Sequence, residues 1–246
     1  MTRVLFASIP EALSSRALAD FVRRSFPHKE NKEYFDLLEK RKNRDSVRES
    51  FAALALLREL LSLHGIKTDS LVFRRSESGK PYFEDTDLHF SLSHSKGYVA
   101  AALSDSTRVG IDIECAEVPK DRAEKMIKRF FSEGRTGDFS TPSHAAEPPP
   151  TDDISHTAEN FVRIWTKAEA YAKMTGTGLD KVIKNTQLPH FYTEEEQGRV
   201  VFEYYNADGY PLTACLEKAD GEIDFFKTDL ENFIKKAEYE IFNENR

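Results

Sequence analysis

The sequence has little cysteine, no long apolar run and no excess of positive charge. Its two cysteines, Cys115 and Cys215, are far apart and form no CxxC or Cys/His cluster. We therefore expect neither a disulfide framework nor a structural zinc site. No apolar run approaches the roughly 18 to 20 residues of a membrane-spanning helix, and the first residues show no secretory pattern, so we expect a cytoplasmic protein without a membrane partner.

Acidic residues outnumber basic ones, 42 to 35, which gives a formal net charge of −7. Because nucleic-acid affinity comes mostly from clustered Lys and Arg, we do not expect a nucleic-acid partner. Local basic stretches could still bind a phosphorylated small molecule. The 246 residues, 39% of them hydrophobic, suffice for one large core or two small ones.

Hydrophobic spacing divides the chain into helices and short strands. Apolar residues at helical spacing predict helices over 10–26, 45–63, 119–131, 160–174 and near 230–239. Short β-like runs between turn residues predict strands at 3–8, 70–74, 88–93, 98–104, 108–114, 199–205, 211–217 and 223–226. The segment 132–159 is rich in Pro and Gly and poor in large apolar residues, so we expect a mobile surface loop there.

This order of elements, helix and then strands, occurs twice. It predicts an α+β fold of two similar, pseudo-symmetric halves, about 1–117 and 118–246, each a small antiparallel sheet with helices. The active site would then lie in the crevice between the halves.

The segment Val109–Glu114, VGIDIE, is the most informative for chemistry. Strand alternation sends its three apolar side chains to one face, and Gly110, Asp112 and Glu114 to the other. Two carboxylates on one face repel each other unless a cation intervenes, and oxygen ligands suit Mg²⁺. A lone DxE is, however, more often an acidic strand face in water.

The helix FVRIWTKAEAYAK places Trp165, Glu169 and Lys173 along one stripe, at i, i+4 and i+8. Glu169 could complete a set of metal ligands. Lys173 could neutralise a phosphate or, with a lowered pKa, take a proton from an attacking hydroxyl. Taken alone, the Glu–Lys pair is more simply an exposed helix pair.

A third segment combines the turn Gly79-Lys80-Pro81 with the strand HFSLSHS, which includes Ser93 and His94. Its hydroxyls, ammonium and imidazole would offer several donors to phosphate oxygens. A histidine at a strand end is also often a solvated turn residue.

Together and in this order, GKPYF, HFSLSHS, GIDIE and WTKAEAYAK followed by GTGL resemble the large, two-lobed Sfp-type 4′-phosphopantetheinyl transferases. The resemblance covers about residues 44–179. It implies a monomeric enzyme that transfers the phosphopantetheine arm of coenzyme A to a serine of an apo acyl or peptidyl carrier protein and releases 3′,5′-ADP. It also implies Mg²⁺, with Mn²⁺ as a second suitable ion.

The resemblance further implies roles for individual residues. The metal ligands would be Asp112 and Glu169, with Glu114 as a third ligand or one that acts through water. The catalytic residues would be Lys173, Glu169 and Asp112, and Lys173 is expected to handle the proton of the carrier serine. The residues that bind coenzyme A would be Arg48, Lys80, Pro81, Ser93 and His94. One departure is that the lysine expected directly before the glutamate is replaced by Ala168, with Lys167 one position earlier.

Carrier proteins are acidic around the serine, so we expect a basic docking face, which Arg122, Lys125, Lys128 and Arg129 could provide. Two other functions stay open. One is a Mg²⁺-dependent phosphodiesterase or nuclease, since an acidic strand beside an ExxxK helix could hold the ion against a phosphodiester. The other is a non-catalytic module that binds coenzyme A or a carrier protein.

Overall fold

The computed structural model of the chain describes residues 1–115, 154–179, 201–217 and 223–244. Its helices are α1 (Ser15–Ser25), α2 (Asn31–Glu39), α3 (Arg44–Leu63), α5 (Ile154–Thr175) and α7 (Leu230–Glu244). Its strands are β1 (Thr2–Ser8), β2 (Phe73–Arg75), β3 (Pro81–Phe83), β4 (His89–Ser95), β5 (Tyr98–Ser104), β6 (Val109–Ile113), β7 (Val201–Ala207), β8 (Tyr210–Leu216) and β9 (Ile223–Lys227).

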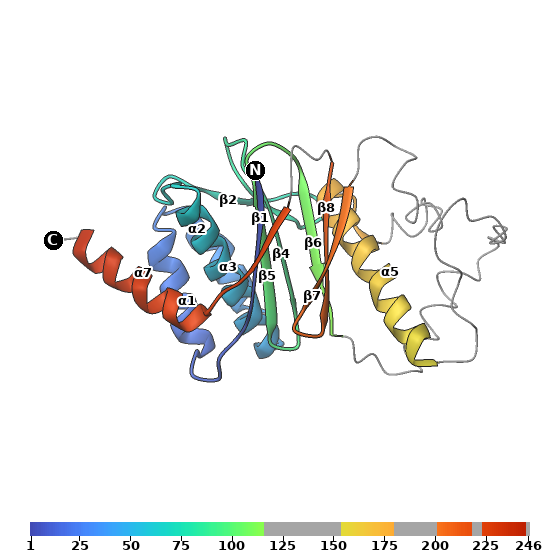
Figure 1. Ribbon diagram of the computed structural model, residues 1–246. Helices are drawn as coiled ribbons and strands as arrows, with labels where there is room; N and C mark the ends of the chain where they lie inside the picture. The colour runs from blue at the N-terminus through green and yellow to red at the C-terminus, as the bar shows by residue number, and fades with distance from the viewer. Residues whose placement is uncertain (116–153, 180–200, 218–222, 245–246) are drawn as a thin grey trace.

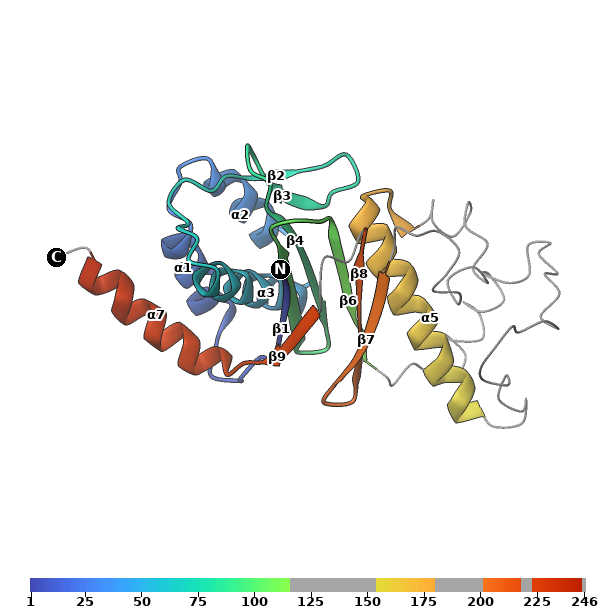
Figure 2. The same cartoon turned by 45° about the horizontal axis from the view of Figure 1, so that its top comes forward.

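These elements form four successive layers (Figure 1). Helices α1, α2, α3 and α7 cover one face of a four-stranded sheet with the order β4-β5-β1-β9. A three-stranded sheet, β6-β8-β7, packs on the other face, and α5 covers its outer side. The short pair β2-β3 stands apart from both sheets, as the turned view shows (Figure 2). The predicted α+β class is confirmed, whereas the similarity of the two halves stays a prediction.

The first core lies between the helix layer and the four-stranded sheet. Helix α3 supplies Phe51, Leu54 and Leu57, each with no exposed surface, because its apolar residues recur at helical spacing. A group of phenylalanines closes the end of this core near the β2-β3 pair. Its members are Phe26, Phe73, Phe83 and Phe90.

The second core lies between the two sheets. Val109, Ile111 and Ile113 of β6 share this core with Ala100 and Ala102 of β5 and with residues of β1. The predicted alternation of β6 is therefore confirmed on its apolar face. Since period-two alternation puts every second side chain on one face, Gly110 and Asp112 must face away from this core.

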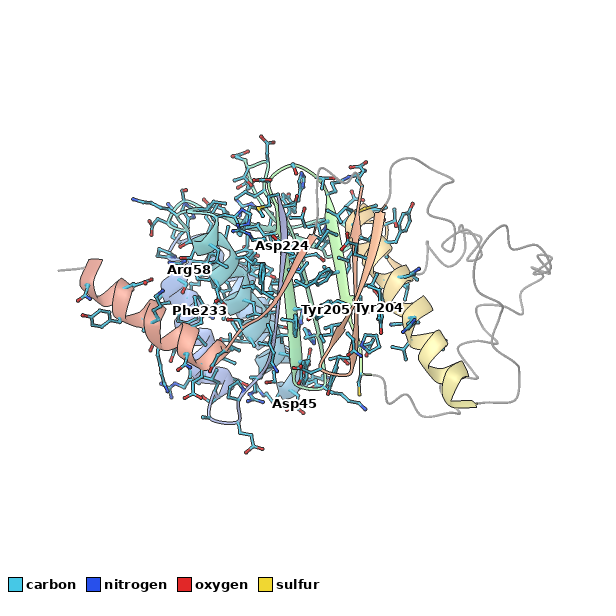
Figure 3. All side chains as sticks on the ribbon, viewed as in Figure 1. Asp45, Arg58, Tyr204, Tyr205, Asp224 and Phe233 are labelled. Atoms are coloured by element: carbon cyan, nitrogen blue, oxygen red, sulfur yellow. The ribbon has the colours of Figure 1, made fainter. Side chains whose placement is uncertain are left out.

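Each sheet also contains a strand from the other part of the chain. Strand β9 pairs in parallel with β1, and β6 pairs antiparallel with β8. Helix α7, which follows β9, packs against the first helices, where Phe233 meets Phe21 edge to face at 5.9 Å (Figure 3). Strands β9 and β7 are edge strands of the two sheets, and there the ring of Tyr205 of β7 stacks on the ring of Phe225 of β9, with 5.0 Å between the ring centroids. The boundary near residue 117 stays a prediction.

The structure corrects several predicted elements. Helix α1 begins at Ser15, because the side chain of Ser14 accepts a hydrogen bond from the N–H of Ala17 and so caps the helix there. Residues 154–159, predicted as loop, belong to helix α5, and α2 and β3 were not predicted at all. The predicted helix 119–131 and the rest of the predicted loop lie outside the described residues. Within the described ranges, no helix is long and apolar enough to span a membrane.

Candidate active site

Strand β6 places Asp112 at the junction of the two sheets, beside β4. Only 6% of Asp112 is exposed. Its Oδ1 accepts hydrogen bonds from Ser93 Oγ and from Lys173 Nζ, both at 2.7 Å. Its Oδ2 is buried and has no hydrogen-bond partner among the described residues. A buried carboxylate oxygen without a partner is costly, so this atom is suited to a ligand.

Glu114 follows the end of β6 and, as predicted, lies on the same face as Asp112. Its Oε2 accepts a hydrogen bond of 2.7 Å from Ser95 Oγ. Glu169 comes to the same region from α5. Burial first, and then the negative charges of Asp112 and Glu114, raise the pKa of Glu169 to about 7, although Lys173 acts in the opposite direction. The three predicted metal ligands are thus electrostatically coupled.

Helix α5 packs so closely on β6 that the side chain of Lys173 forms an ion pair with Asp112. The approach depends on Gly110, since a Cβ there would lie 2.0 Å from the carbonyl oxygen of Ala170 and 2.4 Å from the backbone nitrogen of Met174. Both contacts are with helix backbone, which no side-chain rotation can relieve. Glycine at this position therefore allows the helix that carries Glu169 and Lys173 to pack directly on the strand that carries Asp112.

The donor set fits a divalent cation in its chemistry. The three carboxylates supply oxygen ligands, which Mg²⁺ prefers. A bound cation would reduce the repulsion between these carboxylates and would give the buried Oδ2 of Asp112 a partner. As placed, however, no three His, Cys, Asp or Glu side chains of the described residues converge into a metal-binding group. The ammonium of Lys173 supplies the positive charge nearest to Asp112 in this arrangement.

A second group of predicted residues lies on the opposite face of β4, against α3. His94 Nδ1 lies 2.9 Å from Glu49 Oε2, and His94 Nε2 lies 3.4 Å from Ser50 Oγ. Glu49 Oε1 also accepts a hydrogen bond of 2.6 Å from the N–H of Gly97 in the β4–β5 turn. Burial alone would raise the pKa of Glu49, but the bonds from His94 and Gly97 leave it lowered.

Arg48 lies one position before Glu49 on α3, and its guanidinium holds the turn before α1. Its Nε donates to the carbonyl of Leu13 at 2.8 Å and its Nη2 to the carbonyl of Pro10 at 2.6 Å. Arg41 lies nearby and donates to Ser50 Oγ at 3.0 Å. Two guanidinium groups and an imidazole therefore lie close together, which suits the binding of a phosphate.

Lys80 lies on the other side of Asp112, in the turn that leads into β3. Its Nζ donates to the carbonyl of Val109 at 3.1 Å. Burial lowers the pKa of Lys80 to about 8, and the positive charges of Arg108 and Lys173 add to this effect. Pro81 starts β3, where it pairs with Arg75, and so it lies beside Lys80 in the chain.

The structure thus brings the predicted residues together in two groups. Asp112, Ser93 and Lys173 are in direct contact, with Glu114 and Glu169 around them, whereas His94 lies against α3, the helix that carries Arg48. Sequence reasoning missed three contributors to these groups: Glu49, Ser95 and the packing role of Gly110. The serines at positions 91, 93 and 95 recur with the period of a strand, and this spacing was the signal available for Ser95.

Comparison with known proteins places the chain in a family. Residues 108–234 match the family model of the 4′-phosphopantetheinyl transferase superfamily. The chain is 27% identical over 180 residues to the 4′-phosphopantetheinyl transferase gsp of Aneurinibacillus migulanus, a match that covers 70% of this chain and 69% of the relative. It is also 27% identical over 183 residues to psf-1 of Bacillus pumilus, covering 70% and 72%. With AcpT of Salmonella typhi it shares 38% over 115 residues, covering 46% and 54%.

Because the family model matches more than half of the chain, this protein belongs to the 4′-phosphopantetheinyl transferase superfamily. Its likeness to gsp and psf-1 confirms the predicted Sfp type within that superfamily. It is an enzyme that transfers the phosphopantetheine group of coenzyme A to a carrier protein, as the resemblance predicted. The comparisons support neither the phosphodiesterase or nuclease alternative nor the non-catalytic module.

Proposed function

We propose that this enzyme performs the transfer at the junction of β4, β6 and α5, with Mg²⁺ held by Asp112, Glu114 and Glu169. The observation that carries the proposal is the 2.7 Å contact between Lys173 Nζ and Asp112 Oδ1. It joins two motifs that are 61 residues apart in the chain. With a cation on the carboxylates and the ammonium of Lys173 beside them, the junction would bind the negatively charged pyrophosphate of coenzyme A.

The cation would contribute charge that the protein groups lack. When bound, Mg²⁺ neutralises phosphate oxygens and makes the phosphorus more open to attack. The buried, unpartnered Oδ2 of Asp112 and the raised pKa of Glu169 support a cation at this point. Mn²⁺ also takes oxygen ligands, so the same residues would suit it.

Coenzyme A would extend from this junction toward α3 on one side and the β2-β3 turn on the other. We propose that His94 and Arg48 bind phosphate, with Glu49 holding His94 through Nδ1. Since the imidazole is held at Nδ1, the direction of its other nitrogen is fixed. Lys80 and Pro81 would border the adenine, as the family resemblance implies.

In the reaction, the hydroxyl oxygen of the carrier serine forms a bond to the β-phosphorus of coenzyme A. The bond from that phosphorus to the bridging pyrophosphate oxygen breaks, and 3′,5′-ADP leaves with the electron pair. Two roles are open to Lys173, which can stabilise the charge on the phosphate or accept the serine proton. Its ion pair with Asp112 favours the first role, because an ammonium must lose a proton before it can accept one. The serine proton would then pass to water.

The partner would be an apo acyl or peptidyl carrier protein. Residues 122–129, which were predicted to form the basic docking face, lie outside the described residues, so this face stays a prediction. We further propose that the enzyme acts as a monomer in the cytoplasm. The support for a monomer is that β4, β6 and α5 of a single chain already bring the charged groups of the site together.

Intact-mass analysis of an apo carrier protein incubated with this enzyme, coenzyme A and Mg²⁺ tests the proposal. We expect a gain of one phosphopantetheine group, and its loss in Asp112→Asn and on removal of divalent cations with a chelator. Asp105→Asn is the matched control, because Asp105 is an exposed aspartate that bonds to the N-terminus rather than to the site. Equal transfer by the Asp112 and Asp105 variants would exclude this site.

A further inference from the structure

Strands β4 and β6 are edge strands of different sheets, and serine side chains join them. In an antiparallel pair, every second residue directs its backbone groups away from the partner strand. In β6 these outward N–H groups belong to Ile111, Ile113 and the following Cys115. They donate to the hydroxyls of Ser91, Ser93 and Ser95 at 3.0, 3.2 and 3.2 Å, respectively. We call these three residues the serine ladder.

The ladder also contacts the carboxylates of the site. Each hydroxyl that accepts a strand N–H still has its own proton to donate. Ser93 donates this proton to Asp112 and Ser95 donates to Glu114, both at 2.7 Å. Consequently, two of the three serines that hold β6 in place also hold a carboxylate of the proposed metal site.

Ser93 has no hydrogen-bonding capacity left for another ligand. Its oxygen accepts from the N–H of Ile113 and from Lys173 Nζ at 2.9 Å, while its proton goes to Asp112. A hydroxyl offers one donor and two acceptor sites, so all of them are used. The hydroxyl therefore cannot turn away from Asp112 without losing its bond from Ile113 or from Lys173.

We infer that Ser93 is a positioning residue, which holds Asp112 by Oδ1 so that Oδ2 is directed to the ligand. This inference rests on the proposed function, and it gives Ser93 a role other than direct contact with coenzyme A. The carboxylate receives two donors on one oxygen and none on the other. Groups that orient a metal ligand typically contribute about 10- to 100-fold to metal affinity or activity.

Ser91 provides a matched control in the same ladder. It is 3% exposed and Ser93 is 4% exposed, and both accept one N–H from β6. No carboxylate of the described residues bonds to the hydroxyl of Ser91. Truncation of Ser91 removes one bond between the sheets, whereas truncation of Ser93 removes the bonds to Ile113, Asp112 and Lys173 and so releases a carboxylate.

The test compares Ser93→Ala with Ser91→Ala in the full-length enzyme. We expect both variants to lower the urea midpoint of unfolding, and Ser93→Ala to lower it more, because it breaks three hydrogen bonds rather than one. Only Ser93→Ala should weaken Mn²⁺ binding, measured by electron paramagnetic resonance with coenzyme A present, by about 10- to 100-fold. The Mg²⁺ concentration for half-maximal transfer should rise in parallel, and Ser93→Thr, which keeps the hydroxyl, should recover much of the loss.

Ser95→Ala serves as a second variant if Ser93→Ala does not fold, because Ser95 is less buried and holds Glu114 in the same way. It too should weaken Mn²⁺ binding relative to Ser91→Ala. Equal Mn²⁺ affinity in the Ser91 and Ser93 variants would overturn the positioning role while leaving the proposed function intact. A native enzyme that transfers the group without binding Mn²⁺ or Mg²⁺ would instead overturn the proposed metal site and this inference with it.

Discussion

Substitution of Gly110 by alanine tests how closely helix α5 must pack on β6. The new Cβ would lie 2.0 Å from the carbonyl oxygen of Ala170, whereas real Cβ atoms essentially never come closer than 3.0 Å. Strand and helix must therefore separate by about 1 Å, because the atoms that block the methyl group belong to the helix backbone. No neighbouring side chain can move to make room.

The expected cost has two parts. Overpacking of this kind destabilises a protein by about 1–3 kcal/mol, and a contact with backbone puts Gly110→Ala at the upper end of that range. The second part concerns the reaction, since α5 carries Glu169 and Lys173 while β6 carries Asp112. A displacement of about 1 Å between reacting groups can cost roughly 100-fold in rate. We therefore expect a stability loss of about 3 kcal/mol and a loss of kcat of roughly 100-fold.

Urea unfolding and the rate of carrier modification measure the two parts separately. Gly65→Ala is the control, because Gly65 follows α3 with φ +68° and no atom lies within 4 Å of the point that a methyl group there would occupy. Alanine in that left-handed conformation should cost about 1 kcal/mol without affecting the rate. If Gly110→Ala unfolds like the native enzyme and keeps kcat within about twofold, the argument from close packing is wrong.

Three further predictions concern single side chains. Lys173→Arg should transfer at least about 10-fold faster than Lys173→Ala, because it keeps the positive charge, and equally slow variants would instead indicate that Lys173 accepts the proton. Glu49→Gln should raise KM for coenzyme A about 10-fold with little change in kcat. The reason is that an amide has one acceptor oxygen, whereas the two carboxylate oxygens of Glu49 accept from His94 and from the N–H of Gly97. An unchanged KM would contradict this reasoning. Lys80 has a folded pKa of about 8 against the ordinary 10.5, so the unfolded chain holds this proton to higher pH. From pH 8 to 10.5 the free energy of unfolding should therefore rise by about 2 kcal/mol relative to Lys80→Met, and parallel pH profiles of the two proteins would refute the shift.

The sequence was most informative where the pattern is local. Alternation along Val109–Ile113 correctly placed the apolar face of β6, because side chains of a strand alternate whatever its neighbours are. The spacing of Glu169 and Lys173 likewise placed both on a helix that reaches Asp112. The order of the motifs, read as a family resemblance, predicted the enzyme class that the family match confirms.

The parts that could not be predicted depend on contacts between distant segments. Pairing of β6 with β8 and of β9 with β1 is set by packing across the whole chain, and nothing local indicates it. Glu49 looks like any helical glutamate until the β4–β5 turn brings His94 and Gly97 to it. Helix α2 was not predicted because it has only nine residues and several of them are charged, so its apolar residues give too weak a helical pattern.

The parallel pairing of β9 with β1 has a consequence for the order of folding. Strand β9 lies far behind β1 in the chain, so the four-stranded sheet lacks one edge until β9 has been synthesised. Until β8 has been synthesised, β6 likewise has no strand of its own sheet to pair with. The nascent chain therefore exposes two unpaired strand edges, which invite aggregation. We expect both sheets to assemble late and together, and the catalytic junction, which needs β4, β6 and α5 at once, to form with them.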